Sequence, residues 1–104
     1  MSFVVGLSTA AEADLERLFD FLLDRAETTD DLDRAQAAID AIRATTQHRL
    51  AITPFSFRKA AQNPAQRELI IPFGGIGYVA LYEIVSPPKV VVLAVRHQRE
   101  EDYH

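Results

Sequence analysis

The chain has 104 residues, which suits a single domain (residues 1–104) with one hydrophobic core. A hydrophobic content of 48% and a charged content of 25% exclude a disordered chain, and the lack of cysteine excludes disulfides and cysteine-ligated metals. The net charge is −4, which excludes an overall basic footprint for nucleic acid.

The charge is unevenly distributed along the chain. Residues 1–50 hold ten Asp or Glu and five Arg, whereas residues 51–104 hold five Asp or Glu and six Lys or Arg. The second half can therefore present a local cationic face. No apolar run is long enough for a membrane span, and the N-terminus lacks the features of a secretory signal. We expect a cytoplasmic protein with no membrane partner.

The N-terminal half predicts one strand and two helices. Residues 3–7 (FVVGL) are apolar and β-branched, as in a strand. Ser8 or Thr9 is a candidate N-cap for the first helix, and Thr9 with Glu12 fits a capping box. The apolar stripe of that helix is Leu15, Leu18, Phe19, Leu22 and Leu23, and we expect Asp14, Glu16, Arg17, Asp20 and Asp24 on its solvated face.

A second helix follows after a short break at residues 28–31, where Thr28 begins a run of capping residues. It is rich in alanine and is expected to end near Leu50, before Pro54. Two helices joined by so short a link predict an antiparallel hairpin.

The C-terminal half predicts an antiparallel meander. Residues 52–66 read as an irregular loop from which Phe55 and Phe57 reach the core. The expected strands are residues 67–73, 78–85 and 90–95, joined by a glycine hairpin at 74–77 and a Ser-Pro-Pro-Lys turn. The fold class is α+β, with the N-terminal strand and the helical hairpin packed on this sheet.

The last two predicted strands are apolar on both faces. A helical hairpin covers only one face of a small sheet. The other face is then either an exposed apolar surface that marks a partner site, or a surface covered by the loop that carries Phe55 and Phe57. The sequence leaves both alternatives open.

The end of the chain, VVVLAVRHQREEDYH, passes abruptly from an apolar strand to a polar cluster. Its candidate functional residues are Arg96, His97, Arg99, Tyr103 and His104. Arginine, histidine and tyrosine together are the groups that metal-free RNA cleavage would use. The alternative is a solvated, charged tail, and Arg96 and His97 point to opposite faces if the strand persists. The spacing of His97, Glu100 and His104 matches no known metal site.

Three motifs resemble the RelE/ParE superfamily of bacterial toxins, and the ParE-like branch most closely. They are R-E-L at Arg67, G-Y-x-x-L-Y around Tyr78 and Tyr82, and V-R-H-Q-R-E from Val95. Together with residues 7–22 the likeness spans essentially the whole chain.

The resemblance implies the toxin of a type II toxin–antitoxin module, neutralised by a ParD-like or similar antitoxin in a hetero-oligomer. ParE-like members inhibit DNA gyrase, whereas RelE-like members cleave mRNA on the ribosome. A third possibility is an inactive protein that only binds antitoxin. No cofactor, metal or sequence-specific DNA contact is expected, and partner-binding residues are expected at Tyr78, Tyr82, Arg96 and Arg99.

Carried over by position, Arg67, Arg96 and Tyr103 match phosphate-binding and catalytic positions of the RelE-like nucleases, with His97 and His104 as weaker candidates. Against a nuclease, the chain is acidic and has only two lysines, Lys59 and Lys89. The ParE-like interpretation is therefore preferred, with the ribonuclease as the alternative.

Overall fold

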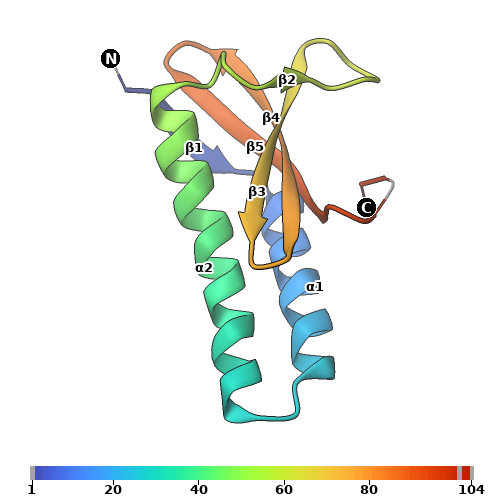
Figure 1. The fold of residues 1–104 in the computed structure, drawn as a ribbon. Helices are drawn as coiled ribbons and strands as arrows, with labels where there is room; N and C mark the ends of the chain where they lie inside the picture. The colour runs from blue at the N-terminus through green and yellow to red at the C-terminus, as the bar shows by residue number, and fades with distance from the viewer. Residues whose placement is uncertain (1, 101, 104) are drawn as a thin grey trace.

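The computed structural model describes residues 2–100, 102 and 103, so His104 lies outside the described residues. A four-residue strand, β1 (Val4–Leu7), leads into helices α1 (Thr9–Arg25) and α2 (Thr29–Ile52). The remaining strands are β2 (Arg58–Lys59), β3 (Gln66–Phe73), β4 (Ile76–Ser86) and β5 (Lys89–His97). Both helices lie on one face of the sheet, and their lower halves extend past its end (Figure 1).

The five strands form one mixed sheet in the order β1-β5-β4-β3-β2. Strands β2 to β5 are antiparallel neighbours, which confirms the predicted α+β meander. The N-terminal strand joins this sheet beside β5 in parallel, and the two helices and strands β2 to β4 lie between them in the chain. The predicted strand boundaries are correct to within two residues, and the loop predicted at residues 52–66 also contains the short strand β2.

Both helices begin at capped termini. Ser8 caps α1 by accepting a hydrogen bond from the Ala11 backbone N–H at 3.1 Å, so the capping box predicted for Thr9 and Glu12 is wrong. Glu12 instead forms a two-bond ion pair with Arg43 of α2 at 2.8 and 3.0 Å. Thr28 and Asp31 form a reciprocal capping box at the start of α2, which confirms the predicted break.

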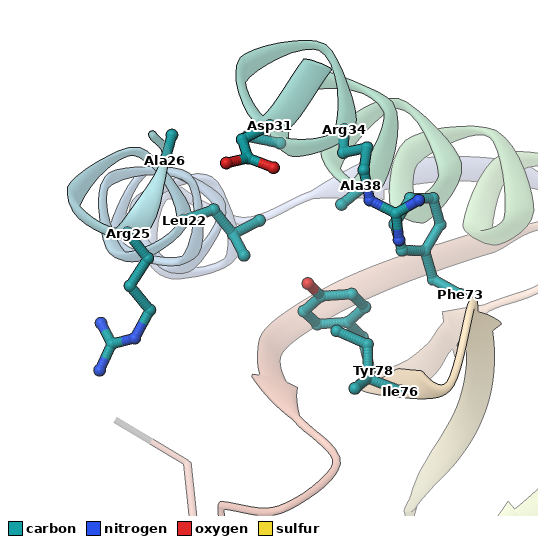
Figure 2. A pocket seen from close by; sticks show the side chains of 10 residues that line it. Leu22, Arg25, Ala26, Asp31, Arg34, Ala38, Phe73, Ile76 and Tyr78 are labelled. Carbon is teal, nitrogen blue, oxygen red and sulfur yellow. The ribbon is translucent and has the colours of Figure 1, made fainter. Parts of the chain in front are cut away.

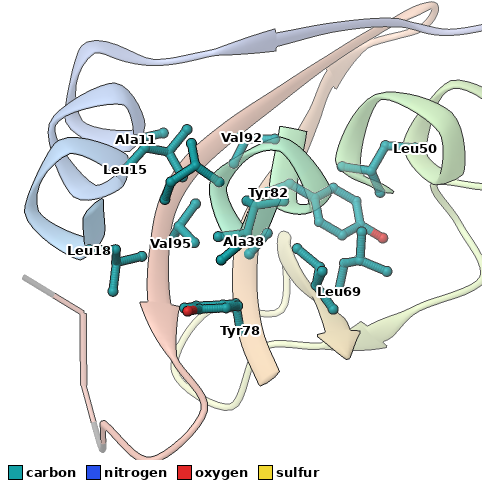
Figure 3. Close-up of a cluster of buried hydrophobic side chains, with 14 of the residues drawn as sticks. Ala11, Leu15, Leu18, Ala38, Leu50, Leu69, Tyr78, Tyr82, Val92 and Val95 are labelled. Atoms are coloured by element: carbon teal, nitrogen blue, oxygen red, sulfur yellow. The ribbon is translucent and has the colours of Figure 1, made fainter. Parts of the chain in front are cut away.

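The core lies between the helical hairpin and the sheet (Figure 3). Leu15 and Leu18 of α1 pack with side chains of β4 and β5, and Phe57 packs against the same cluster from the loop. Burial of such side chains stabilises the fold by roughly 1.5–3 kcal/mol each. The largest fully buried side chains are Tyr78, Tyr82, Leu15, Ile42, Leu50, Leu69 and Ile71.

A β-bulge explains why β5 is apolar on both faces. Tyr82 pairs with Val92 and Leu81 pairs with Ala94, so Leu93 is an extra residue on β5. The extra residue reverses the alternation of the strand. Val92 before the bulge and Val95 after it are therefore both fully buried in the core.

Candidate functional site

The N-cap residue Ser8 and Asp14 of α1 cap the edge of β5 beyond the end of β1. Ser8 Oγ donates to the Leu93 carbonyl at 3.1 Å, and Asp14 Oδ2 accepts from the Val95 N–H at 2.8 Å. Asp14 is only 5% exposed, so the expectation that it lies on the solvated face is wrong. Its carboxylate takes the place of a strand neighbour for a backbone group that would otherwise be buried without a partner.

The C-terminal turn is tied to the same edge through Glu100. Its carboxylate accepts hydrogen bonds from the His97 backbone N–H at 3.0 Å and from Arg17 Nη1 at 2.8 Å. The side chain of Arg17 is one-third exposed, so its ion pair with Glu100 is partly screened by water. These contacts fix the path of the chain directly after β5.

On the face of the sheet opposite the helices, Glu68, Arg96 and Tyr103 form one cluster. Tyr103 Oη donates to Glu68 Oε2 at 2.6 Å, and the Arg96 guanidinium lies 5.1 Å from the Tyr103 ring centroid. Glu68 also pairs with Arg58 at 3.0 Å and with Arg96 at 3.8 Å. The structure thus brings Arg96 and Tyr103 together, as expected of a shared site.

The guanidinium of Arg96 is already engaged within the chain. Its Nη1 donates to the Glu100 carbonyl at 2.5 Å and makes longer contacts with the carbonyls of His97 and Gln98. Its side chain is 13% exposed, and Glu68 supplies the counter-charge. A phosphate could approach this arginine only by displacing these partners and by overcoming repulsion from Glu68.

The Tyr103 hydroxyl is held in its protonated form. Burial raises the pKa of Tyr103 far above its ordinary value, and donation of its hydrogen to Glu68 raises that pKa further. A tyrosine that acts as a general base must first lose this proton. The cluster therefore disfavours Tyr103 as a general base. Its contacts hold the C-terminal segment against the sheet.

Arg67 lies on the other face of the sheet. It pairs with Tyr82 in the β3–β4 register, and its Nη1 donates to the carbonyls of Phe57 and Phe55 at 2.8 and 3.2 Å. Residues opposite each other in a register share a face, and Tyr82 faces the core. The convergence of Arg67 with Arg96 and Tyr103 that a nuclease site requires is therefore absent.

The C-terminal segment covers part of the face that the helices leave open. A cavity of about 210 Å³ lies between Tyr103, Leu81 and the chain at residues 60–62. The loop residues Phe55 and Phe57 lie elsewhere: Phe57 packs against the core and Phe55 is 58% exposed. Of the two alternatives for the second face, cover by these phenylalanines is therefore wrong, and the exposed apolar surface left there includes Ile70, which is 41% exposed.

His97 projects toward the helices, opposite to Arg96, as the strand alternation predicts. Its ring meets Tyr78 edge-on at 5.5 Å, and its Nδ1 accepts a hydrogen bond from the Arg99 backbone N–H at 3.0 Å. Arg99 itself is exposed. Within residues 2–100, 102 and 103 no three His, Asp or Glu side chains gather as a metal site.

The two tyrosines expected to contact a partner are core residues. Tyr78 is 1% exposed and Tyr82 is fully buried. Tyr82 donates its hydroxyl hydrogen to the Pro54 carbonyl at 2.5 Å, and burial raises its pKa to about 12. A buried ring offers almost no surface to another protein. The expectation that the rings of Tyr78 and Tyr82 contact a partner is therefore wrong.

Two hollows that the sequence did not reveal lie beside Tyr78. The first, of about 220 Å³, lies between α1, α2 and the β3–β4 turn (Figure 2), and the second, of about 370 Å³, lies between α1 and the end of β5. Leu22, Ile76 and Tyr78 line both. The second hollow is also lined by Phe21, an apolar residue beside the α1 stripe that is 48% exposed.

A comparison with solved structures finds the same fold in a known protein. The chain has a TM-score of 0.72 to a structure of the chromosomal ParDE toxin–antitoxin system from P. aeruginosa, at 14% identity, over 92% of this chain and 96% of that one. This likeness shows the fold.

A family model for the ParE toxin of the type II toxin–antitoxin system parDE matches residues 5–102. The chain is also 38% identical to Toxin RelE3 of Caulobacter vibrioides, over 92% of this chain and 95% of that protein. The chain therefore belongs to the ParE toxin family, within the RelE/ParE superfamily. Among the described residues no helix is long and apolar enough to cross a bilayer.

Proposed function

We propose that this protein is a toxin that inhibits growth by binding DNA gyrase, and that a cognate antitoxin neutralises it in a cytoplasmic hetero-oligomer. The observation that carries the choice of target is the separation of Arg67 from Arg96 and Tyr103 across the sheet. A ribonuclease needs its cationic and proton-transferring groups around one phosphate.

The electrostatics of the outer-face cluster support the same choice. Glu68 lies within hydrogen-bond distance of Tyr103 and within 3.8 Å of Arg96, so the cluster carries its own anion. The whole chain has a net charge of −4. Binding to ribosomal RNA depends on cations that release counterions from phosphates, and in this chain 15 Asp and Glu outnumber 11 Lys and Arg. Binding to a protein target such as gyrase does not require an excess of cationic side chains.

The antitoxin partner is supported by family membership and by the surface of the chain. The P. aeruginosa structure at a TM-score of 0.72 is described as a ParDE toxin–antitoxin system. Val4, Ile52 and Phe55 are each more than half exposed on this chain, and such apolar surface is typical of a protein with a partner. Direct sequence-specific contact with DNA is not part of the proposal.

A gyrase supercoiling assay with purified toxin tests the proposal. Supercoiling of relaxed plasmid should fall as toxin is added, and prior addition of the cognate antitoxin should restore it. The same toxin without gyrase should leave the plasmid unchanged, which controls for a contaminating nuclease. Full gyrase activity at toxin concentrations that arrest growth would refute the proposed target.

The second candidate is a ribosome-dependent mRNA endonuclease. The contact between Arg96 and Tyr103, and the name RelE3 carried by the Caulobacter relative, favour it. It predicts cut mRNA in a translating extract, with cleavage lost on Tyr103→Phe, which removes only the hydroxyl. Intact mRNA beside arrested growth would rule it out. Overexpression without any growth defect would instead favour an inactive protein that only sequesters antitoxin.

A further inference from the structure

The end of the molecule at which α2 finishes collects exposed apolar side chains. The last turn of α2, the start of β1 and the β4–β5 turn lie together at this end (Figure 1). Among the described residues seven large apolar side chains are exposed, and four of them belong to these segments or to the loop that follows α2. They are Val4, 64% exposed, Phe55, 58%, Ile52, 57%, and Val85, 54%.

Contacts between these segments make one continuous surface. The Phe3 N–H donates to the Ala51 carbonyl at 2.7 Å, which fixes the start of β1 beside the last turn of α2. The Phe3 ring meets the Phe55 ring edge-on at 5.9 Å. We call this surface the β1 corner, and it consists of Phe3, Val4, Ile52 and Phe55. Because the fold already holds these side chains together, a partner that docks here orders few of them on binding.

The segments that form and border the β1 corner carry no carboxylates. Residues 1–11, 41–67 and 84–99 contain eight Lys or Arg and no Asp or Glu, whereas the rest of the chain holds three Arg and all 15 Asp and Glu. Arg49 lies one turn before Ile52 on α2, and Lys89 is the register partner of Val4; both are exposed. The corner is therefore apolar at its centre and cationic at its margin, although the chain as a whole is acidic.

The composition of the corner selects the chemistry of its partner. A surface with one sign of charge repels a second copy of itself, so a symmetric dimer through the corner is disfavoured. Surfaces that bind DNA are polar and cationic, whereas protein interfaces bury an apolar centre within a polar rim. An apolar patch of another protein, flanked by carboxylates, therefore matches the corner in both hydrophobicity and charge.

We infer that the β1 corner is the surface through which the toxin contacts gyrase, and that it docks on an apolar patch of gyrase flanked by Asp or Glu. Ile52 and Phe55 are buried in this contact. Arg49 and Lys89 pair with the carboxylates of the partner. Arg67 takes no part, because its guanidinium is engaged with two carbonyls of the loop. The identity of the partner rests on the proposed function, whereas the position and chemistry of the surface come from its exposure and charge.

A pair of serine variants on α2 tests the apolar part of the surface. Ile52→Ser should raise the toxin concentration that half-inhibits gyrase supercoiling by about three- to tenfold, because an apolar side chain is lost from the contact. Leu32→Ser, the matched control, removes a side chain that is 47% exposed at the other end of the same helix and should leave that concentration unchanged. Both side chains are exposed in the free toxin, so the melting temperature should change little. Wild-type inhibition by Ile52→Ser would overturn the inference.

A charge-reversal pair tests the cationic margin. Lys89→Glu should weaken inhibition of gyrase by about three- to tenfold, with the largest loss at low salt. Lys59→Glu makes the same change at an exposed position of β2, which lies at the opposite edge of the sheet from β1, and should have little effect. Equal losses in both variants would overturn the inference, because they would show a response to net charge alone.

Calorimetry with gyrase in the absence of DNA identifies the partner. Ile52→Ser and Lys89→Glu should show the same losses there as in the supercoiling assay. Losses that appear only on plasmid DNA would assign the corner to DNA, and loss of the antitoxin complex with normal inhibition of gyrase would assign it to the antitoxin; either result overturns the inference. If wild-type toxin leaves gyrase fully active, the proposed target fails as well. If the wild type and both variants inhibit equally, the inference alone fails.

Discussion

Arg67 and Arg96 leave the sheet on opposite faces. Arg67 pairs with the buried Tyr82 and reaches the carbonyls of Phe55 and Phe57, whereas Arg96 pairs with Val79 and lies against Glu68. The two arginines that family resemblance assigns to one nuclease site thus serve separate structural purposes. One fastens the loop before β2, and the other fastens the C-terminal segment.

Replacement of Arg67 should therefore affect stability rather than activity. Arg67→Ala removes two hydrogen bonds from a charged donor, so the free energy of unfolding should fall by about 1–2 kcal/mol, measured by urea denaturation. Growth inhibition per folded molecule should be unchanged. Lys59→Ala is the control, because Lys59 is the exposed register partner of Arg67 on β2. Loss of toxicity in a folded Arg67→Ala variant would contradict this account.

Asp14 should be among the most sensitive positions of α1. Asp14→Ala leaves the Val95 N–H buried without a partner and should cost about 1–3 kcal/mol of unfolding free energy. For a domain of this size each kcal/mol lowers the melting temperature by about 4–8 °C. Asp14→Asn keeps an acceptor oxygen and should cost less. Glu16→Ala on the exposed face should be nearly neutral, and an equal loss at Glu16 would contradict the role given to Asp14.

The three tyrosines should not ionise near their ordinary pKa of 10.0 while the protein is folded. Burial raises the pKa of Tyr78 and Tyr103 and raises that of Tyr82 to about 12. Because these folded-state pKa values lie above the unfolded value, the stability they confer is complete below pH 10 and is lost as the pH rises further.

A spectrophotometric titration of tyrosinate checks this expectation. The absorbance should stay flat through pH 10 and rise at higher pH together with unfolding, followed by circular dichroism. Tyr103→Phe should lose stability less steeply in alkali than the wild type. A tyrosine that titrates at pH 10 in the folded protein would show that its hydroxyl is open to water.

The helices and most of the sheet could be predicted from the sequence, because strong local signals define them. The Leu15 stripe fixes α1, and Thr28 with Asp31 marks the start of α2. The two glycines at 74 and 75 mark the β3–β4 turn, where Gly74 has a φ of +59°. Each of these signals depends on residues that are close together in the chain.

Features set by distant residues could not be predicted in this way. The bulge at Leu93 lies within a run of apolar residues, so no change of pattern marks it. Asp14 lies on the polar side of α1 in a helical projection. It is buried nevertheless, because its carboxylate accepts the Val95 N–H at the edge of β5. The sequence placed Arg67, Arg96 and Tyr103 in one site by analogy, and only the strand register separates them.

We propose that the toxin acts on gyrase and does not cut RNA. The most direct measurement adds one preparation of purified toxin, over the same concentration range, to a gyrase supercoiling reaction and to a translating extract with a reporter mRNA. We expect supercoiling to fall with toxin concentration and to recover with antitoxin, while the mRNA stays intact. Cleaved mRNA beside fully active gyrase would contradict the proposed target.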